Sequence, residues 1–344
     1  MAHADTFSAG KGSPRRIGRT IALIAAAGVL ALMAGWGVLA IWFAVLPQWG
    51  KITAIAGYLL GMLFLPLFLR PLRRGLLADL ALFGLVLAWY FSIPSSNSRD
   101  WQPDVSLLPW SEIRGDIVTV HNIRNCDYRS ETDYTCRYYD KTFDLRNLKS
   151  VDMFLVHWGS PHIAHPIMSF GFGNDGYLAF SIETRKEKGE EYSAIRGFFR
   201  QYELTYVVAD ERDVIRLRTN YRKEDVHLYS LKGKLDTARH ILLDYLAEVN
   251  RLHDRPRWYN ALTTNCTTAI RSHAVPYSRN SLLDWRIIIN GTMDEMLYEM
   301  GSLEQTLPFA ELKRRSYINP AAQAADHDPD FSRRIRTGLP GMTR

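Results

Sequence analysis

The stretch HPIMSFGFGNDGYLAFSIET (His165–Thr184) decides how the soluble part of this chain folds. Two apolar runs flank the turn sequence GNDG at positions 173–176. Glycine and asparagine readily adopt the positive φ angles of a tight turn, so the pattern predicts a β-hairpin.

The same hairpin predicts a chemical pairing. His165 begins the first strand, and Glu183 and Thr184 end the second, so these residues lie near each other across the ladder. If Glu183 shares the face of His165, its carboxylate can orient the imidazole, which is the third role in a Cys–His–acid arrangement. The turn register is not fixed by the sequence. A surface ion pair of Glu183 with Arg185 or Lys186 is the alternative.

The candidate nucleophile lies in the segment WYNALTTNCTTAIR (Trp258–Arg271). The residues TTN at 263–265 are good N-caps, which predicts a helix from Cys266 to His273. A thiol on the first helical turn lies beside unpaired N–H groups and the positive end of the helix dipole. Both favour a thiolate, so Cys266 is predicted to be the nucleophile of a covalent mechanism. Burial of Cys266 as a small, inert hydrophobic residue is the alternative.

His165 is the favoured general base for Cys266, with His162 as the alternative. The helix start, together with Asn265, would hold the oxyanion of an attacked carbonyl group. His157, His162 and His165 also raise the question of zinc, but their spacing fits no common zinc pattern, so no metal is predicted.

The chain has three cysteines, Cys126, Cys136 and Cys266. The first two flank a polar, turn-rich segment, DYRSETDYT. A hairpin there would bring them within bonding distance, and an oxidising compartment would then allow a disulfide. Two unpaired thiols are the alternative. Either way Cys266 is left over, which favours a free, reactive thiol.

The front of the chain is strongly apolar, although the 344 residues carry a net charge of +6. Apolar runs cover Thr20–Val45, Ile52–Leu69 and Leu76–Ile93. Each is about long enough to cross a bilayer as a helix. The first run exceeds a signal-peptide core and a second follows almost at once, so we expect three spans rather than a cleaved signal.

Basic residues predict the orientation of these spans. Before the first span lie Lys11, Arg15, Arg16 and Arg19, and between the first and second spans lies only Lys51. Between the second and third spans lie Arg70, Arg73 and Arg74, and Arg99 alone follows soon after the third. The positive-inside rule therefore places the N-terminus in the cytoplasm and everything after Ser95 outside. In a diderm bacterium this is a multi-pass inner-membrane protein with a periplasmic domain.

The remaining patterns outline the domain. Strands are expected at 116–123, 149–158, 204–209, 214–219 and 226–231, and helices at 192–203, 236–252 and 292–303. The predicted organisation is a tail (1–16), three spans (17–95), a linker (96–112), a folded domain (113–305) and a partly disordered tail (306–344). No phosphate-binding loop or dinucleotide fingerprint occurs, so no cofactor is predicted, and no basic–aromatic pattern indicates nucleic acid.

Several motifs, in this order, resemble the periplasmic domain of the Lnb family. They are DYRSETD (127–133), RYYD (137–140), HPIMSFGF (165–172), SIETRKEKGE (181–190), FRQYEL (199–204), DERDVIRLRTN (210–220) and YNALTTNCTT (259–268). The resemblance covers roughly residues 113–303. Lnb proteins are bacterial lipoprotein N-acyltransferases, which are thought to move a fatty acyl chain from phospholipid to the amino group of a lipoprotein's N-terminal cysteine.

The resemblance places Cys266 on the family's Asn-Cys-Thr motif and His165 on its His-x-x-x-Ser-Phe motif. The order of His before Cys is also similar to permuted papain-like enzymes such as lecithin:retinol acyltransferase. The expected fold is therefore α+β, with three transmembrane helices followed by a papain-like antiparallel sheet and helices. The predicted catalytic residues are Cys266, His165, Glu183 and Asn265.

The chain departs from the family in one respect. Membrane helices follow the domain in the family's acyltransferases, whereas here three spans precede it, so the substrate does not follow from the resemblance. We expect a membrane-anchored thiol acyltransferase that acts on phospholipid acyl chains, with a lipoprotein amine as acceptor. The alternatives are a papain-like amidase or peptidase of the cell envelope, and a non-catalytic anchored domain.

Overall fold

The computed structural model describes residues 14–274, 286 and 290–342. The chain forms two compact units, Met1–Pro94 and Ser95–Arg344, and each is described by itself.

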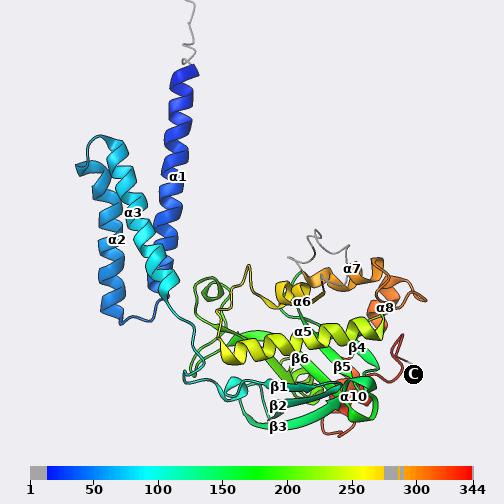
Figure 1. Cartoon of the computed structure of the whole chain (residues 1–344). Helices are drawn as coiled ribbons and strands as arrows, with labels where there is room; N and C mark the ends of the chain where they lie inside the picture. Colours follow the sequence, from blue (N-terminus) through cyan, green and yellow to red (C-terminus); the bar gives the residue numbers. More distant parts are fainter. Residues whose placement is uncertain (1–13, 275–285, 287–289, 343–344) are drawn as a thin grey trace, which may run out of the picture. The chain divides into compact units, whose positions relative to one another are not determined.

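The first unit contains three long helices, α1 (Pro14–Trp42), α2 (Gln48–Phe68) and α3 (Leu72–Ser92) (Figure 1). Each contains an apolar segment long enough to cross a membrane, so three long apolar helices form where the spans are predicted. Gly75 allows the start of α3 to approach α2 closely, because a Cβ atom there would lie 2.3 Å from the Cα of Pro66. Asp79 is buried within this unit.

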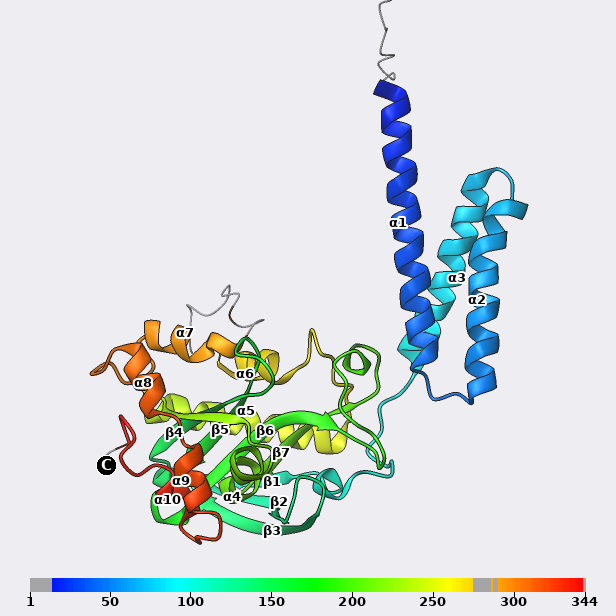
Figure 2. The same cartoon turned by 180° about the vertical axis from the view of Figure 1, so that it is seen from behind.

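The second unit is built on one eight-stranded sheet (Figures 1 and 2). Its strands are β1 (Trp110–Arg114), β2 (Ile117–Tyr128), β3 (Tyr134–Asp144), β4 (Ser150–His157), β5 (Ala164–Gly171), β6 (Tyr177–Arg185), β7 (Glu203–Ala209) and β8 (Asp225–Ser230). The order is β1-β2-β7-β6-β5-β4-β8, and β3 pairs with β2. Neighbouring strands are antiparallel except β2 and β7, which are parallel. The predicted α+β class is confirmed, but the sheet is mixed and not purely antiparallel as expected.

The hairpin predicted at 165–184 is β5 and β6. Gly173 and Gly176 have φ angles of 61° and 81°, which explains the glycines at both ends of the turn. The register pairs Gly171 with Tyr177 and Ile167 with Ser181. Because side chains alternate along a strand, His165 and Glu183 project from the same face of the sheet.

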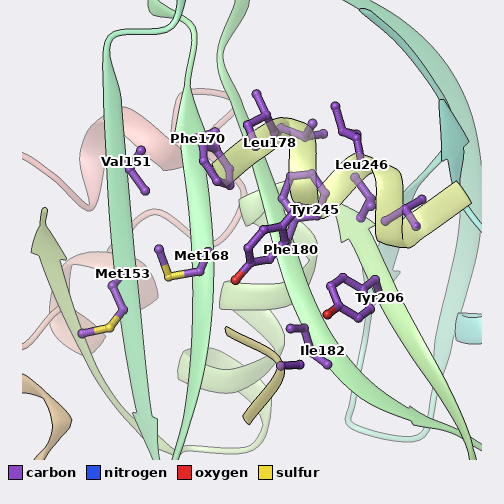
Figure 3. Packing of buried hydrophobic residues seen from close by; sticks show 14 of the residues in the cluster. Val151, Met153, Met168, Phe170, Leu178, Phe180, Ile182, Tyr206, Tyr245 and Leu246 are labelled. Carbon is purple, nitrogen blue, oxygen red and sulfur yellow. The ribbon is translucent and has the colours of Figure 1, made fainter. Parts of the chain in front are cut away.

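One face of the sheet packs against α5 (Leu235–Asp254), α6 (Cys266–Ala274) and α7 (Met293–Glu299), and α8 (Phe309–Arg315) packs beside α7. We call this the α5 face. Its core is largely aromatic and aliphatic, and Tyr245 of α5 lies against Phe180 with ring centroids 5.3 Å apart (Figure 3). The helix expected at 236–252 is therefore confirmed, because its apolar stripe covers the sheet.

The opposite face packs against α4 (Glu211–Arg216), the π-helical turn η5 (Leu217–Tyr221), α9 (Asn319–Ala324) and α10 (Phe331–Arg334). We call this the α4 face. Its apolar core contains Val156, Ile167 and Ile215. Short 3-10 turns complete the described fold: η1 (Pro103–Val105), η2 (Leu145–Asn147), η3 (Gly173–Asp175), η4 (Arg196–Phe198) and η8 (Asn290–Thr292).

Two predicted elements take another form. The strand expected at 214–219 is α4 and η5, because the acidic sequence DERD at 210–213 stabilises a helix start and a short apolar run does not fix the period. The helix expected at 192–203 is reduced to the single turn η4.

The predicted linker and C-terminal tail are both packed against the domain. In the linker, Trp101 is buried and the Asn97 amide donates to the carbonyl oxygens of Leu252 and His253. In the tail, Phe331 is buried and Arg336 pairs with carboxylates on the α4 face. Polar composition predicted freedom for both segments, but their polar groups bond to the rest of the domain instead.

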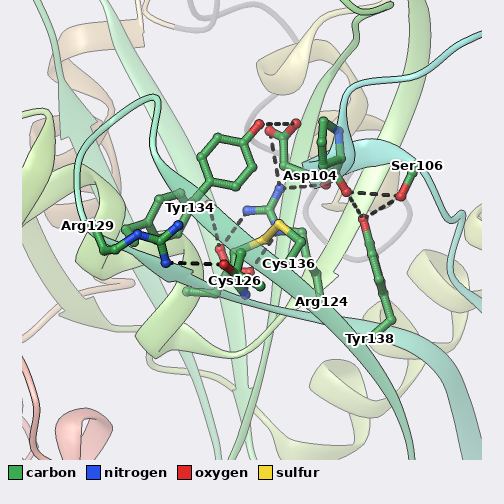
Figure 4. Close-up of a disulfide and its surroundings, with 12 residues drawn as sticks. Asp104, Ser106, Arg124, Cys126, Arg129, Tyr134, Cys136 and Tyr138 are labelled. Carbon is green, nitrogen blue, oxygen red and sulfur yellow. Dashed lines mark hydrogen bonds and ion pairs between the residues drawn. A yellow bond between two sulfur atoms is a disulfide. The ribbon is translucent and has the colours of Figure 1, made fainter.

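The predicted disulfide is confirmed. Cys126 and Cys136 lie directly opposite each other on β2 and β3 and are bonded (Figure 4). Closing so short a loop stabilises the fold by about 2–3 kcal/mol in the chain-entropy view. The buried carboxylate of Asp213 fixes this hairpin to α4, since it accepts from the backbone N–H of Cys126 and from Nε and Nη2 of Arg124.

Candidate functional site

Helix α6 begins at Cys266, as predicted. Asn265 caps it: its Oδ1 accepts from the Thr268 N–H at 2.9 Å, and its own N–H donates to Thr268 Oγ1 at 2.9 Å. This is a reciprocal capping box with threonine in the third position. The remaining amide group of Asn265 donates to the Ala261 carbonyl at 2.8 Å. The Asn265 side chain is therefore used to build the helix start, which argues against its expected part in holding an oxyanion.

The cap does not use the backbone N–H groups of Cys266 and Thr267, so these groups can interact with the sulfur. Hydrogen bonds from the Thr267 hydroxyl and from the N–H groups of Thr267 and Cys266 lower the thiol pKa, and Thr267 Oγ1 lies 3.8 Å from Sγ. Burial has the larger effect and raises the pKa of Cys266 above its ordinary value. The expected resting thiolate is therefore wrong: the cost of charging a buried sulfur exceeds the help from the helix start.

Three tyrosines lie within electrostatic range of the sulfur, Tyr192, Tyr245 and Tyr259. Tyr245 is 1% exposed, and its hydroxyl has no hydrogen-bond partner among the residues that the structure describes. A buried hydroxyl without a partner costs about 1–3 kcal/mol. Tyr245 is therefore a candidate donor to a bound substrate. In the sequence it lies within the helix expected at 236–252, and no pattern there marks it as functional.

The sheet opens next to α6. The ladder between β5 and β6 ends with the pair of Ile167 and Ser181. His165 and Glu183 each lie two residues beyond this pair, outside the ladder. Helix α6 contacts both strands. Its first turn thus lies where two central strands separate.

Asn290 ties this helix start to β5. Its side chain accepts from Ala164 N–H at 2.8 Å and donates to both Ala164 O and Thr267 Oγ1 at 2.6 Å. The residue beside the candidate base is thereby linked to the residue beside the candidate nucleophile. Asn290 lies 24 positions after Cys266, and no local pattern marked it.

A polar relay begins at His165 on the α4 face. The Nε2 atom of His165 lies 2.8 Å from Ser181 Oγ, and Ser181 donates to Glu183 Oε1 at 2.7 Å. A serine hydroxyl donates one proton only, so His165 donates from Nε2 and its Nδ1 is the basic atom. The predicted His165–Glu183 partnership is thus indirect, with Ser181 between them.

Arg218 completes the relay. It donates to Glu183 Oε1 at 3.2 Å and pairs with Glu224 at 3.2 Å, so Glu183 pairs with Arg218 rather than with Arg185 or Lys186, the alternative that the sequence left open. Burial alone would raise the pKa of Glu183, but Arg218 and then His165 hold it below its ordinary value. Burial, with a further contribution from Arg218, lowers the pKa of His165 to about 3. At neutral pH the relay therefore joins a neutral imidazole to an ionised carboxylate.

The structure brings the four predicted site residues to one end of the sheet, but not into one cluster. His165 and Glu183 lie on the α4 face, because His165 is directly opposite Val156, which belongs to the core on that face. Cys266 packs against the core of the α5 face. The imidazole and the sulfur thus approach the strand opening from opposite sides.

The other histidines have separate surroundings. His157 lies on the α5 face, and its Nε2 is 2.8 Å from the Gly291 carbonyl. The backbone carbonyl of His162 accepts from the Gly291 N–H. Across the described ranges, no three His, Cys, Asp or Glu side chains converge as a metal site requires.

Comparison with known proteins gives one match. The family model described as the Lnb N-terminal periplasmic domain matches residues 134–291, which include Cys266, His165, Glu183 and Asn265. Neither the curated proteins nor the solved structures give a match to this chain. Together with three helices long and apolar enough to cross a membrane, the family match describes a membrane-anchored periplasmic domain. Residues 134–291 of this chain are therefore similar to the family of Lnb N-terminal periplasmic domains.

Proposed function

We propose that this protein is a membrane-anchored, thiol-dependent acyltransferase. Cys266 takes a fatty acyl chain from a phospholipid and passes it to an amine of the lipoprotein type. The observation that carries the proposal is the capped start of α6, where backbone N–H groups and the Thr267 hydroxyl surround a half-buried free thiol at the point where β5 and β6 separate.

The resting states of the two groups define the first step. The thiol is protonated and the imidazole is neutral, so the proton leaves Sγ for His165 Nδ1 as the sulfur attacks the ester carbonyl, rather than beforehand. His165 has to turn toward the sulfur for this step. No β5–β6 pairing has to break, because that ladder has already ended. Catalytic hydrogen bonds often form only when substrate is bound.

Charge then moves to the carbonyl oxygen. The N–H groups at the start of α6 stabilise this oxyanion, with the unpaired Tyr245 hydroxyl as a further donor. The ester C–O bond breaks, the lysophospholipid alkoxide takes the proton from His165, and the acyl group remains on Cys266 as a thioester. An amine next attacks the thioester and loses its proton to His165, and the departing thiolate recovers that proton.

The relay sets the tautomer of the base before the imidazole turns toward the sulfur. Ser181 and Glu183 hold the Nε2–H tautomer of His165, which keeps Nδ1 available. Asn290 keeps the strand start and the helix start in register. Membrane anchoring raises the effective concentration of lipid substrates around the site. The distribution of basic residues supports a cytoplasmic N-terminus and an inner-membrane location.

Intact-protein mass spectrometry tests the proposal. The full chain is reconstituted in vesicles of phospholipid with isotope-labelled acyl chains, and a labelled acyl adduct that hydroxylamine removes is expected. Cys266→Ser should abolish the adduct. Cys266→Ser combined with Ser272→Cys is the matched control, because it moves the only free thiol further along α6, where no adduct is expected. An adduct that persists in Cys266→Ser would exclude Cys266 as the nucleophile.

The acceptor is tested separately with a lipopeptide that carries a free or an acetylated N-terminal amine. Transfer of label to the free amine alone supports the acyltransferase. Release of labelled fatty acid irrespective of the peptide indicates a hydrolase. In a further experiment the label is placed in the ester-linked chains of the lipopeptide instead of in the phospholipid. If label is transferred to the amine only in that experiment, phospholipid is not the acyl donor.

A further inference from the structure

We infer that the periplasmic domain docks on the bilayer surface itself, through exposed apolar side chains in three loops around Cys266. We call these side chains the docking rim: Trp158, Ile163, Tyr192, Ile195, Phe198 and Leu262, which are 40–64% exposed. A single exposed apolar side chain is ordinary, but a contiguous group of them marks an interaction surface.

Contacts between the three loops make the docking rim continuous. The rings of Trp158 and Tyr192 meet edge to face, with centroids 6.2 Å apart. The Ala261 N–H donates to the Gly197 carbonyl at 3.0 Å, which brings the residue before Leu262 next to the residue before Phe198. The three loops thus present one surface, although they lie up to about a hundred residues apart in the sequence.

The same surface borders the candidate nucleophile. Tyr192 is electrostatically coupled to Cys266, and the Ala261 carbonyl accepts from the side chain that caps α6. A partner seated on the docking rim therefore lies beside the thiol.

The covalent connection to the membrane selects the partner. Helix α3 ends at Ser92, and Ser95 already donates to the Pro256 carbonyl of the domain. Three residue steps span at most about 11 Å, so the chain allows no greater distance between the end of α3 and Ser95. Ser96 N–H then donates to Glu203, which pairs with Trp258.

One loop of the docking rim, which carries Leu262, follows this attachment closely along the chain. Tyr259 N–H donates to the Tyr202 carbonyl directly after the Glu203–Trp258 bridge, and Leu262 follows within three residues. Tryptophan and tyrosine, both present in the rim, are the residues that favour the membrane–water interface. The bilayer that holds the spans is therefore the partner that the rim fits.

Spin-label accessibility tests this inference in the full chain, reconstituted as one copy per lipid nanodisc. Labels are attached at Phe198→Cys, at Leu262→Cys and, as the control, at Leu235→Cys, each in a Cys266→Ala background. Leu235 is 47% exposed and begins α5, whereas the tether attaches near the other end of that helix, about 28 Å away. Removing the nucleophile makes the result independent of acyl transfer.

Collisions with oxygen are expected to exceed collisions with a water-soluble nickel complex several-fold at positions 198 and 262, and the reverse is expected at 235. Equal aqueous accessibility at all three positions would overturn the inference. Spin–spin broadening from a second copy in discs that hold two chains, without an increase in oxygen accessibility, would assign the rim to a dimer and also overturn it.

A label-free measurement guards against perturbation by the label. Backbone amides at 158–163 and 192–198 of the unmodified chain should exchange several-fold more slowly in nanodiscs than in an amphipathic polymer that offers no bilayer. Amides at the start of α5 should not differ. Identical exchange in both environments contradicts docking.

Discussion

The two faces of the sheet are stabilised by different means. On the α5 face, aromatic and aliphatic side chains such as Phe170, Phe180 and Tyr245 fill the space between sheet and helices. The α4 face buries charges: Asp213 with Arg124, and Asp152 and Glu211 with Arg336. The thiol lies on the apolar side and stays protonated, whereas the imidazole lies on the charged side and stays neutral because it is buried near Arg218. The candidate site therefore combines a nucleophile from the apolar α5 face with a base from the charged α4 face.

Removing a charge from the α4 face should have the largest effect on stability. Arg336→Ala leaves the buried carboxylates of Asp152 and Glu211 without their cation, and loss of one partner of a buried ion pair costs about 3–5 kcal/mol. Thermal and denaturant unfolding of the full chain in detergent would measure the loss. Arg314→Ala, which breaks an exposed pair with Glu311, is the control and should have little effect. Equal losses would show that the buried charges are not what stabilises the α4 face.

On the α5 face, Tyr245→Phe should separate activity from stability. The substitution removes only a buried hydroxyl that has no described partner, so unfolding should be unchanged or slightly less favourable. Loss of one oxyanion donor typically lowers a rate by about 10²-fold, and formation of the labelled Cys266 adduct would measure it. Tyr206→Phe is the contrast, because its hydroxyl is bonded to His273 and its loss should cost stability. A normal rate in Tyr245→Phe would remove this residue from the mechanism.

The connection between the two faces can be broken at Asn290. Asn290→Ala leaves Ala164 and Thr267 without their bonds, at an expected cost of about 1–3 kcal/mol, together with slower adduct formation. Unfolding and acylation would be measured on the same preparation. Asn250 makes similar side-chain hydrogen bonds to the backbone of Ser111, away from the site. Asn250→Ala should therefore lower stability without a matching loss of activity. Equal loss of activity in both variants would reduce Asn290 to a structural role.

A further test concerns acid stability, which involves buried histidines on both faces. Burial lowers the pKa of His165 to about 3 and that of His273 to about 4, against an ordinary value of 6.5. The unfolded chain thus binds more protons than the folded one between about pH 6.5 and 4, so stability falls as the pH drops through this window. Each histidine contributes at most about 1.4 kcal/mol per pH unit. His273→Gln should flatten the dependence, whereas exposed His327→Gln should not. An unchanged slope in His273→Gln would contradict the burial argument.

Local patterns predicted much of this arrangement. The hairpin β5–β6, the helix start at Cys266, the Cys126–Cys136 bond and the three apolar spans each depend on neighbouring residues or on one simple period. Ser181, Arg218 and Asn290 were missed because their roles depend on register and on contacts between distant segments. The thiolate prediction failed for a related reason: the helix start is a local feature, whereas burial of the sulfur depends on the whole fold.

The position of Arg336 bears on how much of the chain the domain needs in order to fold. Asp152 and Glu211 are made early in the chain, but the cation that neutralises them comes about 125 residues or more later. Until that arginine arrives, the α4 face carries uncompensated negative charge and cannot close. The α4 face therefore depends on a residue close to the C-terminal end of the described chain, and a domain shortened before Arg336 would lack the cation for both carboxylates.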